Sequence, residues 1–319
     1  AQAAILALGL LCASTGYAEI PQRVRGLLQT RLELSISDLR TVDRGRPVAR
    51  SLRAGDRREI AAAGAVLVEV PTEFFLHRFE DIVSFKQSPI VREIGKFGDP
   101  PRLEEMDRLT FEPADLDALR RCRVEDCDIQ LSAGQIQRIQ ATVDWSKADA
   151  RARANRVLRE LLFEYVERYR HAGNQALLEY ANDKAPLRIS DEVRLLVAHS
   201  GELLRGVPEF SEAVLGSARP LPGSSEFIYW SKEQFGLKPV VSITHVTIYH
   251  PRRSDVPDVV IASKQIYASR YVAGSLAITL GVGESANSPS FYMVYANRTR
   301  PRAFPPVVGG LVRRVAQGQ

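Results

Sequence analysis

The chain has 319 residues, of which 45% are hydrophobic and 25% are charged. This balance is typical of a globular protein and excludes wholesale disorder, and the length suffices for one large domain or two ordinary ones. The net charge is +5, but basic and acidic residues are interspersed, for example in residues 151–170. Such a pattern favours a mixed-charge surface over a nucleic-acid interface. We therefore expect no nucleic-acid partner, whereas peripheral contact with an anionic membrane stays compatible with the charge.

The N-terminal segment has the pattern of a signal peptide. Residues 3–14 are an apolar run about as long as a signal-peptide core, and too short to span a bilayer comfortably. Gly16 and Ala18 place small residues where signal peptidase reads them. The pattern predicts a signal peptide over residues 1–18 and a periplasmic or secreted bacterial protein. Lipid attachment at Cys12 and a buried N-terminal helix are the alternatives.

Residues 19–132 combine strand patterns with short helices. Residues 31–42 alternate apolar and polar side chains, as a strand does, and residues 49–71 hold one or two further strands. A helix is expected to begin at Thr72, which is a suitable N-cap, and to continue to about residue 83. Residues 86–101 are predicted as a loop, residues 102–111 and 126–131 as strands, and residues 113–121 as a short helix.

Two cysteines lie close together in this first part. Cys122 and Cys127 have four residues between them, a spacing at which a disulfide closes a small loop in an oxidising compartment. Loop entropy assigns such a bridge roughly 2–3 kcal/mol. Free buried thiols and a metal or redox role are the alternatives. No further thiol or histidine lies nearby in the sequence, so we expect no metal site.

Residues 133–217 are predicted to be helical. Residues 133–143 are amphipathic, and a long helix is expected from a cap at Ser146 to about Tyr180, followed by helices over residues 191–200 and 208–215. Residues 218–319 return to strands: five runs rich in β-branched and aromatic residues predict an antiparallel meander, followed by a terminal helix in residues 305–319. Because strands and helices are segregated, the fold class is α+β.

One strand of the meander has two distinct faces. Leu276, Ile278 and Leu280 lie on one face, and Ala277 and Thr279 on the other. The strand is thus expected to be half-buried, with its small-residue face pointing outward. The other strands are partly apolar on both faces, so we expect one face of the sheet to pack on a helix and the other to line a ligand cavity.

No residue pattern marks a nucleophile, an acid–base pair, a metal site or a phosphate loop, so we expect no cofactor and assign no catalytic residue. His245 and Lys264 lie in mid-strand among apolar residues, where each either faces a cavity or satisfies a hydrogen bond in the core. Amphipathic aromatic residues are suited to pocket walls, and an arginine can anchor a carboxylate or phosphate. The ligand-binding candidates are Trp230, His245, Lys264, Tyr267, Tyr295 and Arg298.

Two segments resemble the START-like, or helix-grip, superfamily. They are GAVLVEVPTEFFLHRFEDI, in which a strand runs into a helix, and FYMVYANRTR at the end of the meander. The chain also resembles secreted bacterial proteins with no assigned activity. The START-like resemblance implies a curved antiparallel sheet that grips a long helix around a hydrophobic cavity for lipids, sterols or polyketides. Residues 133–217 would then be a large helical insertion.

The leading hypothesis is therefore a secreted or periplasmic carrier of an apolar, lipid-like small molecule, held in a cavity between sheet and helix. One alternative is an envelope component that binds a protein partner or anionic lipid without catalysis. The other is a cyclase- or hydrolase-type enzyme on the same scaffold, in which His245 is the general base.

Overall fold

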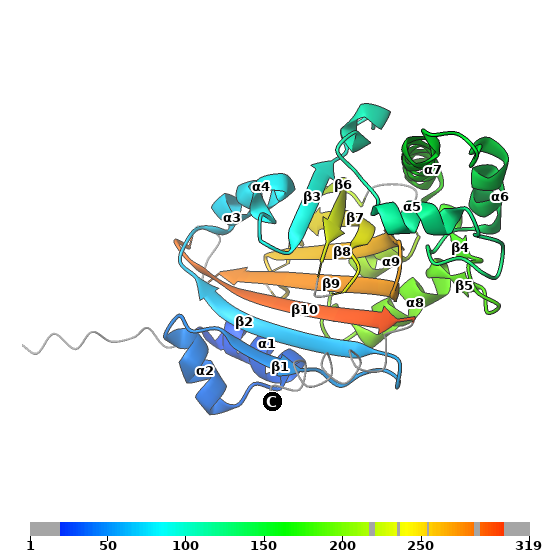
Figure 1. Cartoon of the computed structure of the whole chain (residues 1–319). Coiled ribbons are helices and arrows are strands. Elements are labelled where there is room, and N and C mark those ends of the chain that lie inside the picture. Colours follow the sequence, from blue (N-terminus) through cyan, green and yellow to red (C-terminus); the bar gives the residue numbers. More distant parts are fainter. Residues whose placement is uncertain (1–19, 217–220, 235–236, 254, 284–287, 303–319) are drawn as a thin grey trace, which may run out of the picture.

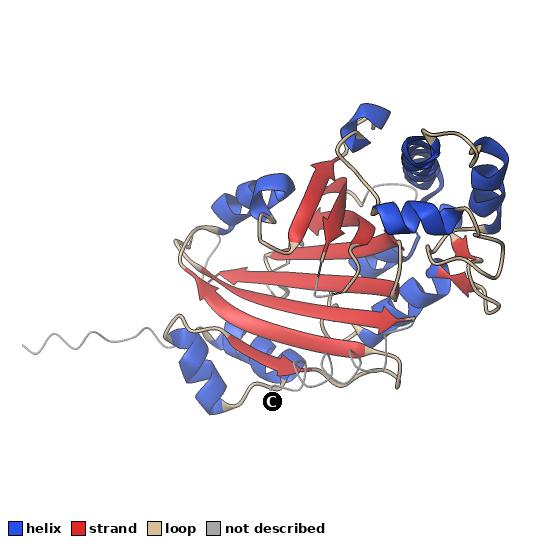
Figure 2. Cartoon of the chain, viewed as in Figure 1, coloured by secondary structure: helices blue, strands red, loops and turns tan. Residues whose placement is uncertain are grey.

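The computed structural model describes residues 20–216, 221–234, 237–253, 255–283 and 288–302. Within them the protein is α+β, as the sequence predicts, and is built on an antiparallel sheet of eight strands (Figures 1 and 2). The strand order is β1–β2–β10–β9–β8–β7–β6–β3. The bounds are β1 Val48–Ser51, β2 Ile60–Val68, β3 Val91–Lys96, β6 Ser224–Glu233, β7 Val240–Tyr249, β8 Val259–Ala268, β9 Val272–Gly283 and β10 Phe291–Pro301. A separate ladder pairs β4 Glu179–Tyr180 with β5 Leu187–Arg188.

Strands from both ends of the chain form this one sheet. β2 pairs with the last strand, β10, and β3 pairs with β6 across the whole helical segment. Figure 1 shows the blue strand β2 beside the red strand β10. The helices of residues 133–217 therefore interrupt the sheet rather than follow it. The expected signal peptide and terminal helix lie in residues 1–19 and 303–319, outside the described residues.

The predicted alternation on β9 is found, and it gives the sheet two different faces. Leu276, Ile278 and Leu280 belong to the main apolar core, on what we call the helical face. Its helices are α1 Gln22–Leu32, α2 Ile36–Asp43, α6 Ala133–Thr142, α7 Ala150–Ala172, α8 Ile189–His199 and α9 Pro208–Gly216. The opposite side, which we call the α3 face, carries α3 Thr72–Glu80 and α4 Ile82–Phe85 at one end. Ala277 and Thr279 lie on the α3 face because side chains alternate along a strand.

The longest helix is shorter than the sequence pattern predicts. α7 begins at Ala150 rather than at Ser146, and it ends at Ala172 because Gly173 adopts φ 57°, outside the helical region. A short 3₁₀ turn, η2 Gly173–Ala176, follows it. Tyr180, expected at the end of the helix, instead belongs to β4, and its hydroxyl accepts a hydrogen bond from the Ala268 backbone. Among the described residues, no helix combines the length and apolar character needed to cross a membrane.

The strand expected over residues 31–42 is wrong. Residues up to Leu32 complete α1, Glu33 reverses the chain with φ 53°, and α2 follows. Ser35 and Asp38 form a capping box, in which each side chain accepts from the backbone N–H of the other. Ile36, which the alternation placed on a buried face, is 65% exposed. A short apolar–polar alternation across two helix ends imitates a strand, and the capping box is the stronger local signal.

Three further expectations between residues 86 and 131 are corrected. Residues 86–101 include β3, which is a strand because it can pair with β6. Residues 102–111 hold a 3₁₀ turn, η1 Leu103–Met106, instead of a strand. Residues 126–131 are not a strand in the described structure, and Asp126 makes isolated bridges to Arg123 and Asp183. The short helix is found as α5 Pro113–Leu119.

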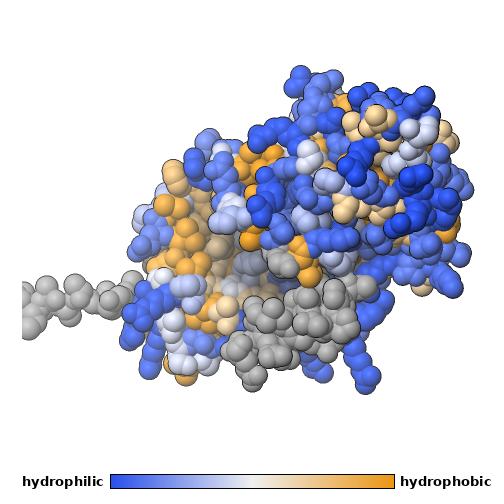
Figure 3. Space-filling model, viewed as in Figure 1, coloured by the Kyte–Doolittle hydropathy of each residue, from blue (hydrophilic) through white to orange (hydrophobic). Residues whose placement is uncertain are grey.

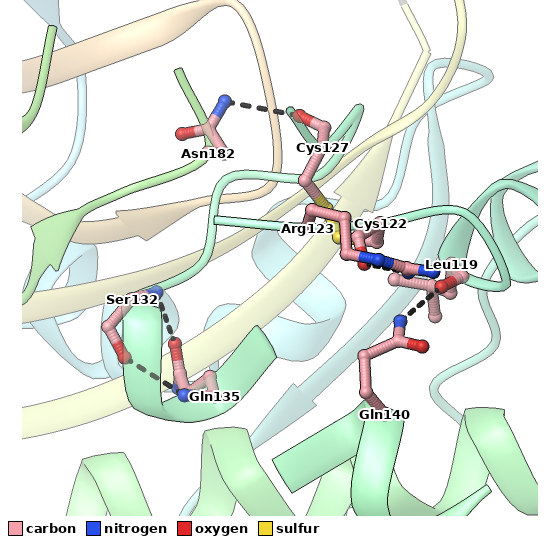
Figure 4. The surroundings of a disulfide bond; sticks show 8 residues. All are labelled: Leu119, Cys122, Arg123, Cys127, Ser132, Gln135, Gln140 and Asn182. Carbon is pink, nitrogen blue, oxygen red and sulfur yellow. Dashed lines mark hydrogen bonds between the residues drawn. A yellow bond between two sulfur atoms is a disulfide. The ribbon is translucent and has the colours of Figure 1, made fainter. Parts of the chain in front are cut away.

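The expected disulfide between Cys122 and Cys127 is formed, with their Cα atoms 4.5 Å apart (Figure 4). Arg123 and Asp126 exchange backbone hydrogen bonds inside the loop, and Glu125 takes a positive φ. The loop is also tied to the segment after β4, because the Cys127 N–H donates to the Asn182 carbonyl at 3.0 Å. The bridge therefore fixes the connection between α5 and the helical segment.

Candidate functional site on the α3 face

The two faces of the sheet separate the six predicted ligand-binding residues. Trp230, His245, Lys264, Tyr267 and Arg298 lie on the helical face, as strand alternation and the cross-strand register place them. Tyr295 lies on the α3 face, opposite Thr279, and is 46% exposed. The structure therefore does not bring the six together into one site.

Trp230 and Tyr267 are core residues of the helical face. The Trp230 ring is fully buried against Gly95, and its Nε1 donates to the Glu105 carbonyl at 3.0 Å. Tyr267 is also buried, and its ring meets that of Tyr180 edge to face at 6.2 Å between centroids. Burial raises the pKa of the Tyr267 hydroxyl well above its ordinary value. Both side chains fill space between the sheet and the helices.

His245 and Lys264 are direct cross-strand neighbours on β7 and β8, and each has protein partners. His245 Nδ1 lies 2.9 Å from the Tyr169 hydroxyl, and its Nε2 lies 3.4 Å from a Glu226 carboxylate oxygen. Lys264 Nζ donates to Asn174 Oδ1 and to the Val214 carbonyl, both at 2.8 Å. The pair thus joins the sheet to α7, η2 and α9.

Burial controls the charge of this pair. Desolvation lowers the pKa of Lys264 to about 7, with a smaller opposing effect of Glu226. Burial likewise lowers the pKa of His245, although the hydrogen bond to Glu226 acts in the opposite direction. Both nitrogens of His245 are within reach of protein groups, which is what an acid–base role requires and also what a structural histidine shows. The hydrogen bonds of His245 and Lys264 to α7, η2 and α9 are sufficient to explain why both side chains are buried, without a ligand.

The α3 face has an apolar end rich in aromatic side chains. Phe75 of α3 contacts the rings of Phe79, Phe85 and Phe291 at centroid distances of 5.9, 5.9 and 5.4 Å. Beneath these helices, the sheet contributes buried residues of β6, β7 and β8, namely Tyr229, Val246, Ile248, Val259 and Ile261. In Figure 3, apolar side chains gather at the side of the molecule where α3 lies in Figure 1.

A polar network adjoins this apolar end. Lys86, directly after α4, donates to Glu233 Oε1 at 2.8 Å and lies 3.4 Å from the Tyr229 hydroxyl. Ser231 donates to the same Glu233 oxygen at 2.9 Å and lies 3.2 Å from the Ser242 hydroxyl. Burial alone would lower the pKa of Lys86, but Tyr229 and Glu233 raise it, so the ammonium group stays charged.

Beyond the network, the α3 face carries small and polar side chains. Ala277 of β9 lies opposite Ser263 of β8, and Thr279 lies opposite Tyr295 of β10. Gln265 of β8 pairs with Thr244 of β7, the cross-strand neighbour of Tyr229. The Gln265 Oε1 atom is buried and has no hydrogen-bond partner among the described residues. Burial raises the pKa of Tyr295, whose hydroxyl therefore stays protonated and able to donate. A buried acceptor without a partner is costly, so this face has unused capacity for a donor from a ligand or from water.

The sequence indicated part of this site. Alternation identified the small-residue face of β9, although as an outer face. Tyr295 was a candidate because an amphipathic aromatic residue is suited to a pocket wall. Lys86, Glu233 and Gln265 were missed: Lys86 falls in a segment predicted as a loop, and its partner lies on a strand that follows the helical segment. The pattern of β6, in which Tyr229, Ser231 and Glu233 share one face, is the signal that could have found the network.

Comparisons with known proteins do not add to this picture, since no protein-family model, curated protein or solved structure matches the chain. The described residues form an α+β protein built on an eight-stranded antiparallel sheet. Helices pack on one face of this sheet, and aromatic, small and polar residues line the other.

Proposed function

We propose that this protein binds an amphipathic, lipid-like small molecule on the α3 face of its sheet, between the strands and the helices α3 and α4. The observation that carries the proposal is the continuity of an aromatic end with a charged polar network and a partnerless acceptor, Gln265 Oε1. A mostly apolar site with a few placed polar groups is the usual form of a small-molecule site. The ligand location thus differs from the one expected around His245 and Lys264.

A START-like fold is part of the same proposal. It is supported by the order of elements, in which β2 leads directly into α3 and α4, β3 follows, and β6 to β10 form a meander. It is also supported by the pairing of β2 with β10, which places the first and last of these strands side by side. On this interpretation, residues 133–217 are a helical insertion, and its helices cover the face opposite to the ligand.

The chemistry of the α3 face divides the ligand into two parts. The hydrocarbon part would contact the phenylalanine cluster around Phe75, where each buried CH₂ group contributes about 0.8 kcal/mol. The polar part would lie near Lys86 and Tyr295. The Lys86 ammonium group, already bound to Glu233, favours an acceptor, and Gln265 Oε1 favours a donor. A fatty alcohol, hydroxylated lipid or acid satisfies this pattern.

A membrane contact follows from the exposed apolar residues at the same end. Phe74 of α3 is 56% exposed, Phe85 of α4 is 45% exposed, and Ile90 is 43% exposed. Exposed aromatic side chains beside a lipid site would let the protein rest on a membrane while the ligand transfers. We place peripheral membrane contact at α3 and α4. The Cys122–Cys127 disulfide supports an oxidising compartment, as the proposed periplasmic or secreted location requires.

Native mass spectrometry of the protein purified from its own host tests the proposal. The expected result is a bound species whose mass matches a lipid and which solvent extraction removes. Ligand-free protein that also fails to take up fatty acids or fatty alcohols in solution would contradict it.

A further inference from the structure

A pocket apart from the α3 face lies at the ends of α1 and α8, beside the connection between β1 and β2. Its volume is about 470 Å³, and its wall includes Arg31, Arg50, Arg53, Arg298 and His199. Arg298 is on the helical face, so this pocket is separate from the α3 face. Nothing in the proposed lipid binding uses it.

A buried carboxylate fixes two of these side chains. The Glu59 side chain has no exposed surface, and its two oxygens bind Arg298 and His199 Nδ1. Because a carboxylate only accepts hydrogen bonds, Nδ1 of His199 carries a proton and Nε2 is left for another partner. Nε2 of His199 has no protein partner among the described residues. Glu59 thus orients the imidazole and the guanidinium at the pocket wall.

Arg298 has an unused donor at this wall. The residue is only 8% exposed, and its Nε is buried without a hydrogen-bond partner among the described residues. Its NH1 donates to Glu59 and, at 3.2 Å, to the Arg53 carbonyl. A buried N–H without a partner costs about 1–3 kcal/mol, and an acceptor in the pocket would recover that cost.

The remaining arginines keep the wall positive. Both terminal nitrogens of Arg31 donate to neutral backbone carbonyls, those of Leu203 and Arg205, at 2.9 Å each. The exposed Arg53 guanidinium has no partner among the residues that the structure describes. Two carboxylates, Glu33 and Glu202, also border the pocket. Arg205 donates to the Glu202 carboxylate at 2.7 and 2.6 Å, so Glu33 is the carboxylate of the wall that can offset its positive charge. Arg50 is paired with Asp38 and Arg298 with Glu59, so Arg31 and Arg53 are the two wall arginines whose charge is set against Glu33.

We infer that this pocket binds a small oxyanion, either a carboxylate or a phosphate group. Arg298 and Arg53 supply the donors, with the His199 imidazole beside them in the pocket wall, and charge-assisted hydrogen bonds from arginine are the strongest available to such a group. The anion can be a free ion or the headgroup of a lipid, because both present the same oxygens.

Calorimetric and NMR titration with inorganic phosphate and with acetate, at constant ionic strength, tests the inference. Saturable binding that shifts the His199 ring signals is expected. Arg53→Ala should weaken binding at least about tenfold. The matched control is Arg57→Ala, because Arg57 is exposed in the same connection but is not part of the pocket wall. Arg298→Lys keeps the charge next to Glu59 but removes the guanidinium fork, and it should also weaken binding.

Equal effects of Arg53→Ala and Arg57→Ala, or no saturable binding of either anion, would overturn the inference. Vesicles of phosphatidate and of phosphatidylcholine separate the two sources. If the protein binds phosphatidate vesicles but not phosphatidylcholine vesicles, and if phosphate or Arg53→Ala abolishes that binding, the anion is a lipid headgroup. If the protein binds phosphate with saturation but binds neither kind of vesicle, the anion is a free ion. Both results support the site, and neither depends on the lipid proposed for the α3 face.

Discussion

Lys86 and Glu233 form an ion pair at 2.8 Å although they are 147 positions apart in the chain. Lys86 follows α4, and Glu233 ends β6, so the contact joins the segment of α3 and α4 to strand β6 on the same face of the sheet. It also places a cation beside the aromatic end of the α3 face. The pair is only partly exposed, at 28% and 16% of the two side chains, so solvent screens it incompletely.

A double-mutant cycle with Lys86→Met and Glu233→Gln measures this pair. We expect a coupling in the free energy of unfolding of about 0.5–1 kcal/mol, because each single variant leaves a partly buried partner unpaired. Denaturant unfolding of the four proteins gives the value. Strict additivity of the two substitutions would mean that the ion pair does not hold α4 to the sheet.

Stability should depend on pH through Lys264. Its folded-state pKa is about 7, below the ordinary value near 10.4, so the unfolded chain binds more protons between these two values. The free energy of unfolding therefore rises with pH from about 7 to 9, by up to about 1.4 kcal/mol per unit. The lowered pKa of His245 likewise makes the free energy of unfolding rise with pH, but in a lower pH range.

Lys264→Met is the variant that isolates this effect. It should lower stability overall, since Asn174 and Val214 lose their donor, and it should also flatten the rise between pH 7 and 9. Denaturant unfolding at several pH values checks both parts. If the variant and the wild type show the same slope, Lys264 is not the group that titrates.

Membrane contact is tested with vesicle co-sedimentation. Phe74→Glu together with Phe85→Glu should reduce binding to phospholipid vesicles by at least about tenfold, because each substitution places a charge where an aromatic ring would enter the interface. Leu195→Glu is the control, since Leu195 is 38% exposed on α8, which packs on the helical face. Equal loss in both proteins would place the membrane contact elsewhere.

The sequence predicted the parts of the fold that local patterns determine. The α+β class, the two-faced strand around Leu280, the disulfide between Cys122 and Cys127, and the helices near Leu116 and Ile136 all follow from spacing and alternation. Residues 31–42 were predicted as a strand, which is wrong, because Leu32, Leu34 and Ile36 alternate by chance across two helix ends.

The candidate site could be predicted only in part, because long-range pairing decides which side chains meet. Alternation separates the face that contains Thr279 from the apolar face, and Tyr295 was a candidate because its ring is amphipathic. The meeting of Lys86 with Glu233 depends on the pairing of β3 with β6, which local sequence does not encode. His245 and Lys264 were candidates because they lie in mid-strand among apolar residues, but which side chains they meet is set by the helices that return over the sheet.

The central claim concerns which face of the sheet binds the ligand, and a fluorescent fatty acid reports it directly. We predict that the wild-type protein binds the probe with saturation and that Tyr295→Asp raises the dissociation constant at least about tenfold, since it puts a charge on the α3 face. Tyr295→Phe should retain most of the affinity. Lys264→Met, on the opposite face, should bind as the wild type does. Unchanged binding by Tyr295→Asp together with lost binding by folded Lys264→Met would contradict the account and place the ligand under the helices.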